Sequence, residues 1–225
     1  MSLRVKICGL TRLEDALHAE ACGAHALGFI FWEHSPRAVT PAAAAAIIAA
    51  LHPFTVKVGV FVNEETGRIN EIAERCRLDR IQLHGGEPYE TLAALNRPAY
   101  RAFRLKDEAA LFAAEQAPDR WMMVDTHDPA LVGGTGRPAN WNWAARLAKS
   151  RSIVLAGGLS AGNVQAAIDA VNPAAIDAAS SLEAAPGHKD PARVEAFFTA
   201  LQQANLSPRS GNQTDAASQA LTTAF

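Results

Sequence analysis

Two residues of this sequence have the chemistry to move protons at a single site. Cys8 ends an apolar run and is followed by a glycine, and Asp125 ends the apolar run 122–124. A thiolate can act as a general base when positive charge lowers its pKa, and Lys6 lies on the same strand face. A partly desolvated carboxylic acid such as Asp125 can donate a proton. The structural alternatives are a packed thiol and a carboxylate that orders a loop.

A second group of residues could hold an anion. Gly157 and Gly158 follow an apolar run and precede a helical stretch, so their backbone N–H groups could approach a phosphate. Ser180 and Ser181 follow the next apolar run and could add further donors, because a phosphate needs several donors from adjacent loops. The alternative for the two glycines is a tight turn with no ligand.

Three other candidates lie at the ends of apolar runs or in the loop that follows one. Arg37 follows a proline that fixes its turn, and a guanidinium can clamp a carboxylate with two hydrogen bonds. His84 could order the site or contact a ligand, and Asp177 directly precedes the segment that carries the serines. For Arg37, and for Arg104 near the end of another run, the alternative is an ordinary surface charge.

Short apolar runs alternate with alanine-rich helical stretches along the whole chain, and eight of the runs predict strands. They are mostly apolar rather than strictly alternating, which is typical of parallel strands covered by helices on one face and by core on the other. The predicted strands are 5–8, 26–31, 57–62, 80–83, 100–105, 121–125, 153–156 and 175–178. Their carboxyl ends carry the candidate residues.

Eight βα units fit either a closed (β/α)8 barrel or a doubly wound open sheet. The open sheet usually carries a GxGxxG turn after its first strand, and the sequence has none there. Phosphate-type turns instead follow the seventh and eighth strands, where a barrel commonly binds phosphate. We therefore predict a single (β/α)8 barrel of near-minimal length, whose strand ends converge on one mouth.

Helix starts are indicated by side chains that can cap a first turn. One of them belongs to a capping box, and two are followed by a proline at the first helical position. The predicted caps are Thr11 (with Glu14), Thr40, Asn63, Ser160 and Asp190.

The overall composition narrows the class of protein. The chain has 225 residues, 49% of them hydrophobic, and a formal net charge of -2, which suits one core and disfavours a nucleic-acid surface. No apolar run approaches the ~20 residues of a membrane span, and no signal peptide is evident, so we expect a cytoplasmic protein. Three cysteines without a CxxC argue against a disulfide scaffold and a zinc site. We expect the barrel to occupy residues 1–204 and a polar tail residues 205–225.

Taken together, several segments resemble the phosphoribosylanthranilate isomerase family of tryptophan biosynthesis. They occur in the family's order across nearly the whole chain up to about residue 204, and their joint spacing is what makes the match specific. The segments are KICGLT (6–11), LGFIFWEHSPRAVT (27–40), VGVFVN (58–63), IQLHGGE (81–87), VDT (124–126), GGTG (133–136), LAGGLSAGNV (155–164) and PGHKD (186–190).

The resemblance implies a small phosphosugar substrate and an acid–base rearrangement without cofactor or metal. The substrate would be N-(5′-phosphoribosyl)anthranilate. In the family pattern, Cys8 matches the general base and Asp125 the general acid, and Arg37 matches the residue expected to bind the anthranilate carboxylate. Gly157, Gly158 and the serines after the eighth strand match the phosphate-binding loops. Neither a monomer nor a homodimer is favoured.

One segment departs from the family pattern. The family usually reads DVSSGVE where residues 177–183 of this chain read DAASSLE. Ala179 therefore replaces a serine and Ser181 replaces a glycine. If that glycine has a positive φ, Ser181 carries a strain of about 1 kcal/mol. Otherwise the loop is slightly reshaped, with Ser180 and Ser181 as donors.

Two other functions remain open. Another phosphosugar enzyme with the same barrel would share the phosphate site, but it would leave Arg37 and the pair of Cys8 and Asp125 unexplained. A catalytically idle barrel that serves as a binding module is supported only by the altered loop. The presence of both proton-transfer residues argues against it.

Overall fold

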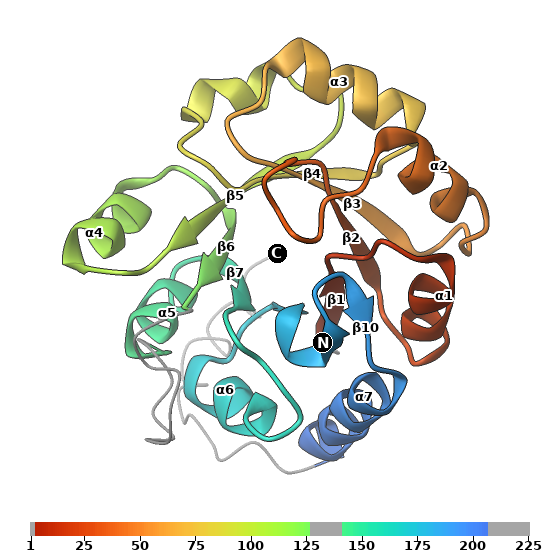
Figure 1. Cartoon of the computed structure of the whole chain (residues 1–225). Helices are drawn as coiled ribbons and strands as arrows, with labels where there is room; N and C mark the ends of the chain where they lie inside the picture. The colour runs from red at the N-terminus through yellow and green to blue at the C-terminus, as the bar shows by residue number, and fades with distance from the viewer. Residues whose placement is uncertain (1–2, 127–140, 207–225) are drawn as a thin grey trace, which may run out of the picture.

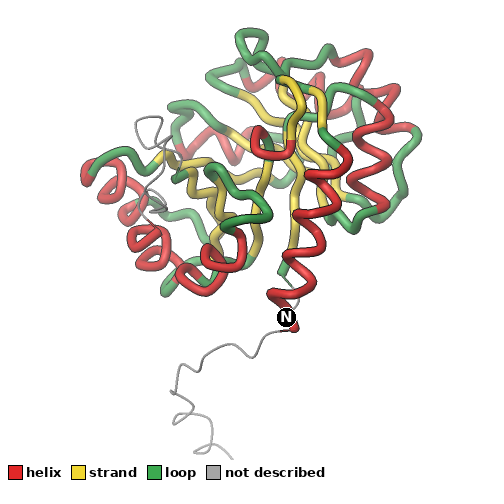
Figure 2. Tube along the Cα trace, turned by 60° about the horizontal axis from the view of Figure 1, so that its bottom comes forward, coloured by secondary structure: helices red, strands yellow, loops and turns green. Residues whose placement is uncertain are grey.

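The computed structural model describes residues 3–126 and 141–206. At its centre the strands β1 to β8 form a closed barrel of parallel pairs, in which β1 also pairs with β8. Figure 1 looks along the barrel, with the helices in a ring outside the strands. The tube view of Figure 2, turned by 60°, also shows the strands inside and the helices outside. The predicted (β/α)8 barrel is confirmed.

Every end of the barrel strands lies within one residue of its predicted position. The strands are β1 (Arg4–Cys8), β2 (Ala26–Ile30), β3 (Val56–Phe61), β4 (Arg80–Leu83), β5 (Ala99–Arg104), β6 (Trp121–Asp125), β7 (Ser152–Ala156) and β8 (Ala175–Ala178). Apolar runs predict most of them because the residues of those strands are buried on both faces, whereas the residues of β5 are only partly buried. In β6, for example, Met122, Met123 and Val124 are all fully buried.

Helices cover the outside of the barrel between the strands. They are α1 (Leu13–Ala21), α2 (Pro41–Ala49), α3 (Thr66–Arg75), α4 (Glu108–Gln116), α5 (Trp141–Ala148), α6 (Val164–Val171) and α7 (Pro191–Leu206). Between β4 and β5, the covering segment is the 3₁₀ helix η1 (Tyr89–Ala94). Within the described residues, no helix is long and apolar enough to cross a membrane.

A short hairpin follows the barrel, and the strand prediction does not include it. The 3₁₀ helix η3 (Ser180–Leu182) leads into β9 (Glu183–Ala185), which pairs antiparallel with β10 (His188–Lys189). The Thr11 hydroxyl donates to the Gly187 carbonyl at 2.6 Å, and the Lys189 N–H donates to the Asp15 carboxylate at 2.9 Å. The hairpin thus ties the last βα loop to the first, where β8 meets β1.

Two of the predicted helix caps are confirmed. The Thr40 hydroxyl accepts the N–H of Ala43 at the start of α2, and the Asp190 carboxylate accepts the N–H of Ala192 at the start of α7. Helix α7 ends at Leu206, two residues beyond the predicted end of the barrel. The rest of the predicted tail, 207–225, and the GGTG segment, 133–136, lie outside the described residues.

The other three predicted caps are wrong, and each has a competing contact. The capping residue of α1 is Arg12, because the Thr11 hydroxyl is bonded to the hairpin instead. The Asn63 side chain accepts the N–H of Gly86, and α3 begins only at Thr66. Ser160 does not cap α6, because the capping position is Asn163, whose side chain accepts the N–H of Ser160.

Candidate active site

The carboxyl ends of the barrel strands surround a cavity of about 270 Å³. Every candidate from the sequence except Ser181 lines it, so the predicted convergence of strand ends occurs. The lining candidates are Cys8, Arg37, His84, Asp125, Gly157, Gly158, Asp177 and Ser180, together with Arg104. They come from six different strand ends and from the loop between β2 and α2. These residues are far apart in the sequence, and the closure of the barrel brings them together.

Cys8 ends β1 and is buried, with only 5% of its surface exposed. Burial raises the pKa of its thiol, and the nearby charge of Lys6 only partly opposes this effect. The expected net lowering of this pKa is therefore wrong, although Lys6 itself acts to lower it. The Lys6 ammonium donates to the buried Asp177 carboxylate at 2.9 Å, and the charge of Asp177 acts together with burial to raise the pKa of the thiol.

The thiol of Cys8 fits into the wall because the facing strand has no side chain at that level. Gly28 of β2 pairs with Cys8 in the sheet register. A β-carbon at Gly28 would lie 2.6 Å from the Cys8 sulfur and 3.0 Å from Cε of Lys6. Carbon and sulfur do not pack that closely without a shift, so the glycine makes room for the two side chains.

Asp125 and His84 approach each other across the mouth. Asp125 ends β6, and His84 follows β4. The distance from Nε2 of His84 to Oδ2 of Asp125 is 3.8 Å, which is too long for a hydrogen bond but close enough for electrostatic attraction. Burial lowers the pKa of His84, and the charge of Asp125 acts in the opposite direction.

Arg37 is already bound to a carboxylate of the chain itself. Its Nε and Nη2 donate to the two oxygens of Glu183, at 2.9 and 2.8 Å. Lys189 donates to the same carboxylate at 2.9 Å. Burial acts to raise the pKa of Glu183, but the hydrogen bonds from Arg37 and Lys189 hold it below its usual value. The remaining N–H groups of Arg37 are left for a ligand carboxylate.

Gly157 and Gly158 adopt a backbone that other residues rarely take. Their φ angles are 109° and 64°, so the turn after β7 depends on glycine at both positions. Ser180 lines the cavity beside them. The loops after β7 and β8 therefore both reach the cavity, at the positions where the sequence predicts a phosphate site.

Ser181 is placed differently from the prediction. Its hydroxyl donates to the carbonyl of Leu159 in the loop after β7, and Ser181 does not line the cavity. Among the described non-glycine residues, positive φ occurs at Asn63, Arg77 and Asn172, so Ser181 carries no left-handed strain. The strain considered for this position is therefore absent, and of the two serines only Ser180 lines the cavity.

Sequence reasoning misses several polar residues that support the mouth. Glu183 binds Arg37, and Lys189 binds Glu183. In the same way, Gln82 contacts His84, and Tyr100 contacts Gln82. Glu183 and Lys189 do lie in segments that resemble the family, but nothing local pairs either one with a residue some 150 positions away. Gln82 lies in β4 next to a buried leucine and has the pattern of an ordinary strand residue.

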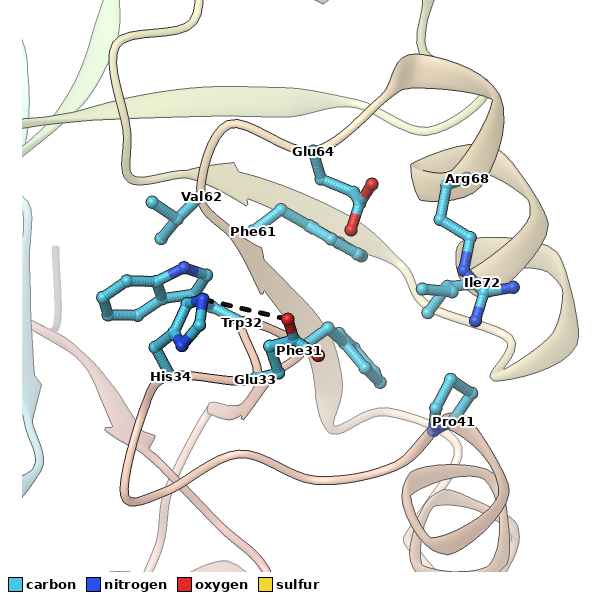
Figure 3. Close-up of a pocket in the computed structure, with 10 residues that line it drawn as sticks. All are labelled: Phe31, Trp32, Glu33, His34, Pro41, Phe61, Val62, Glu64, Arg68 and Ile72. Carbon is cyan, nitrogen blue, oxygen red and sulfur yellow. Dashed lines mark ion pairs between the residues drawn. The ribbon is translucent and has the colours of Figure 1, made fainter.

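A larger pocket, of about 360 Å³, lies on the other side of the loop that carries Arg37. Figure 3 shows Trp32 and His34 on one side of it and Phe31 and Phe61 along its wall. The two phenylalanine rings stack with centroids 5.2 Å apart. None of the candidates from the sequence lines this pocket, so size alone does not locate the chemistry.

The fold and the site together define a (β/α)8 barrel whose mouth brings a thiol, a carboxyl group, an arginine and a glycine turn into one cavity. Barrels of this class bind phosphate with the loops after β7 and β8 and carry catalytic groups on strand ends. The arrangement suits acid–base chemistry on a small anionic molecule.

Comparison with known proteins identifies the family. The profile of the family described as N-(5'phosphoribosyl)anthranilate (PRA) isomerase matches residues 5–200. An N-(5'-phosphoribosyl)anthranilate isomerase of Geobacter metallireducens is 47% identical over 196 residues, which cover 87% of this chain and 97% of that protein. The chain belongs to the N-(5'-phosphoribosyl)anthranilate isomerase family.

Solved structures agree with this assignment. The crystal structure of phosphoribosyl anthranilate isomerase from Thermotoga maritima has a TM-score of 0.83 and 38% identity, over 89% of this chain and 99% of that one. A second crystal structure holds such an isomerase in complex with reduced 1-(o-carboxyphenylamino)-1-deoxyribulose 5-phosphate. It has a TM-score of 0.81 and 36% identity, over the same shares of the two chains.

Proposed function

We propose that Cys8 and Asp125 carry out the Amadori rearrangement of N-(5′-phosphoribosyl)anthranilate to 1-(2-carboxyphenylamino)-1-deoxyribulose 5-phosphate. Membership of the family makes the chain an isomerase of tryptophan biosynthesis. One observation carries the residue assignment. A thiol from β1 and a carboxyl group from β6 line the same cavity of about 270 Å³, beside an arginine and a glycine turn.

In this mechanism each group moves one proton at one place. Asp125 protonates the furanose ring oxygen, and the ring opens to a Schiff base. Cys8 then removes the proton from C2′, and the resulting enolamine tautomerises to the ketone. Because the bound geometry holds both groups against the same sugar, the acid and the base suffice for the two steps.

Substrate binding uses the rest of the mouth. Arg37 holds the anthranilate carboxylate with the N–H groups that Glu183 leaves unused, and Gly157, Gly158 and Ser180 hold the phosphate. Asp177 and His84 complete the substrate site from the floor and the wall of the cavity. Ser181 supports the phosphate loops from outside the cavity through its bond to Leu159.

The test is an assay of the purified protein with freshly generated phosphoribosylanthranilate, followed by the loss of the substrate's fluorescence. We expect Cys8→Ser and Asp125→Asn each to lower kcat/KM by at least ~100-fold, the usual scale of a general acid or base. Cys22→Ser is the matched control and should leave the rate unchanged, since Cys22 lies at the end of α1, away from the mouth.

The possible failures have separate meanings. Full activity in both variants would refute the roles of Cys8 and Asp125. No activity in the wild-type protein would refute the proposed reaction itself.

A further inference from the structure

We infer that Tyr100 and Gln82 hold the imidazole of His84 in the neutral form that carries its proton on Nε2, so that an N–H donor faces Asp125 at the cavity wall. The two are positioning residues, because they act on a ligand only through His84. The order of contacts runs from β5 to β4 and then to the residue after β4.

The first contact fixes the orientation of an amide. The Tyr100 hydroxyl donates to Oε1 of Gln82 at 2.9 Å. Burial raises the pKa of Tyr100, so the phenol keeps its proton at neutral pH and remains a donor. With its oxygen bound to Tyr100, the Gln82 amide turns its NH2 group toward His84. Gln82 is only 1% exposed, so water does not compete for these groups.

The second contact fixes the ring of His84. Nε2 of Gln82 lies 2.9 Å from Nδ1 of His84. In this orientation of the amide, the NH2 group donates, so Nδ1 accepts and carries no proton. A neutral imidazole has one ring proton, which is therefore on Nε2.

The other side of the ring agrees with this assignment. Nε2 faces Oδ2 of Asp125 at 3.8 Å, and an acceptor oxygen at that position favours an N–H over a lone pair. Nε2 is also a buried nitrogen with no hydrogen-bond partner within the described ranges 3–126 and 141–206. A buried donor without a partner needs an explanation, and His84 lines the cavity in which a ligand would bind.

The ring stays neutral in this environment. Burial is the largest influence and lowers the pKa of His84. Lys6 and Arg104 lower it further, whereas Asp125 and Asp177 raise it. With the proposed substrate, the N–H would donate to a sugar oxygen beside the one that Asp125 protonates. This last step rests on the proposed function, but the position of the proton does not.

The position of the proton can be measured without any activity. Protein labelled with ¹⁵N at histidine would be studied by two-bond ¹H–¹⁵N correlation, which separates protonated from unprotonated ring nitrogens, and His84→Gln would assign the signals. We expect a proton on Nε2 and none on Nδ1 in the wild type near neutral pH. In Gln82→Glu, the carboxylate would accept from Nδ1 and bring a proton there. A proton on Nδ1 of the wild type would overturn the inference.

Activity then tests whether the orientation matters to the reaction. We expect Gln82→Glu and Tyr100→Phe each to lower kcat/KM by about 10-fold, the order seen when a residue that orients a ligating side chain is replaced. Thermal unfolding of both variants shows whether the fold is kept. If the proton has moved to Nδ1 but kcat/KM stays within twofold of the wild-type value, the proposed contact between His84 and the ligand is overturned. An inactive wild type with the proton on Nε2 would instead count against the proposed function alone.

Discussion

At the carboxyl ends of its strands, the barrel encloses about 270 Å³ lined by a thiol, carboxylates, an arginine and glycines. At the amino ends it encloses about 740 Å³ lined by apolar side chains such as Phe54, Val56 and Trp121, with Arg4 and Arg80 among them. The same strands line both cavities. In β1, for instance, Arg4 belongs to the larger cavity and Cys8 to the smaller one.

The floor between the two cavities consists of paired polar groups. Lys6 lines the larger cavity and Asp177 the smaller one, and they are joined at 2.9 Å. Tyr100 likewise lines the larger cavity and Gln82 the smaller one, and the Tyr100 hydroxyl donates to Gln82 at 2.9 Å. The end that holds the candidate site is therefore distinguished by its polar side chains, which are bonded to residues of this floor. The larger volume lies at the other end.

The largest expected effect comes from breaking the floor. Lys6→Met leaves Asp177 as a buried carboxylate without its cation, and we expect the free energy of unfolding to fall by about 3–5 kcal/mol. Urea denaturation measures this value. Arg4→Gln, at the exposed start of the same strand, should change it by less than about 0.5 kcal/mol. A Lys6→Met variant as stable as the wild type would mean that the pair does not hold the floor together.

A smaller effect should come from the rim of the reactive cavity. Arg37→Lys keeps the charge but loses the two-point contact, so we expect KM to rise about tenfold, or about 1.4 kcal/mol, with kcat little changed. Steady-state kinetics measure both constants. Arg68→Lys is the control, because Arg68 lines the pocket of Figure 3 instead. Equal effects of the two substitutions would contradict the assignment of the mouth as the binding site.

The pH dependence of Cys8 should show that burial outweighs the charge of Lys6. The thiolate is the form that alkylating reagents attack, and burial raises the pKa of this thiol. The rate of Cys8 alkylation by iodoacetamide, followed by mass spectrometry, should therefore rise through an inflection above the ordinary thiol value of about 8.5. The limb of kcat/KM that reports the base should rise with pH over the same range. An inflection below that value would show that positive charge dominates after all.

The smallest effect is expected at the other end of the barrel. Phe54 is 88% exposed beside the larger cavity. Phe54→Ser should leave kcat/KM within twofold of wild type and change stability by no more than about 0.5 kcal/mol. The fluorescence assay and urea denaturation check both values. A large loss of activity would show that the two ends of the barrel are coupled, and would contradict the contrast drawn between them.

The strands can be predicted because the cause of each is local. A run of apolar residues buried on two faces, such as 122–124, is visible in the sequence itself, and the closure of parallel strands then gathers whatever follows each run. For this reason the apolar runs alone are enough to place Cys8, Asp125, His84 and Gly157 at one mouth.

The errors arise where the deciding partner is distant in sequence. Thr11 has the pattern of a cap but bonds to Gly187, 176 residues away. At Cys8 the charge of Lys6 is opposed by burial and by the charge of Asp177, which is 171 residues away from Lys6. Glu183 and Arg37 likewise meet only after the barrel has closed. Local propensity carries no information about such partners.

The absence of a side chain at Gly28 has an evolutionary consequence. Any larger residue there would collide with the sulfur of Cys8 unless one of the two groups shifts. If Cys8 is the base that we propose, related sequences that keep the thiol should also keep the glycine, although the two residues lie on different strands. Variation at position 28 would then be limited by a reaction in which that residue takes no chemical part.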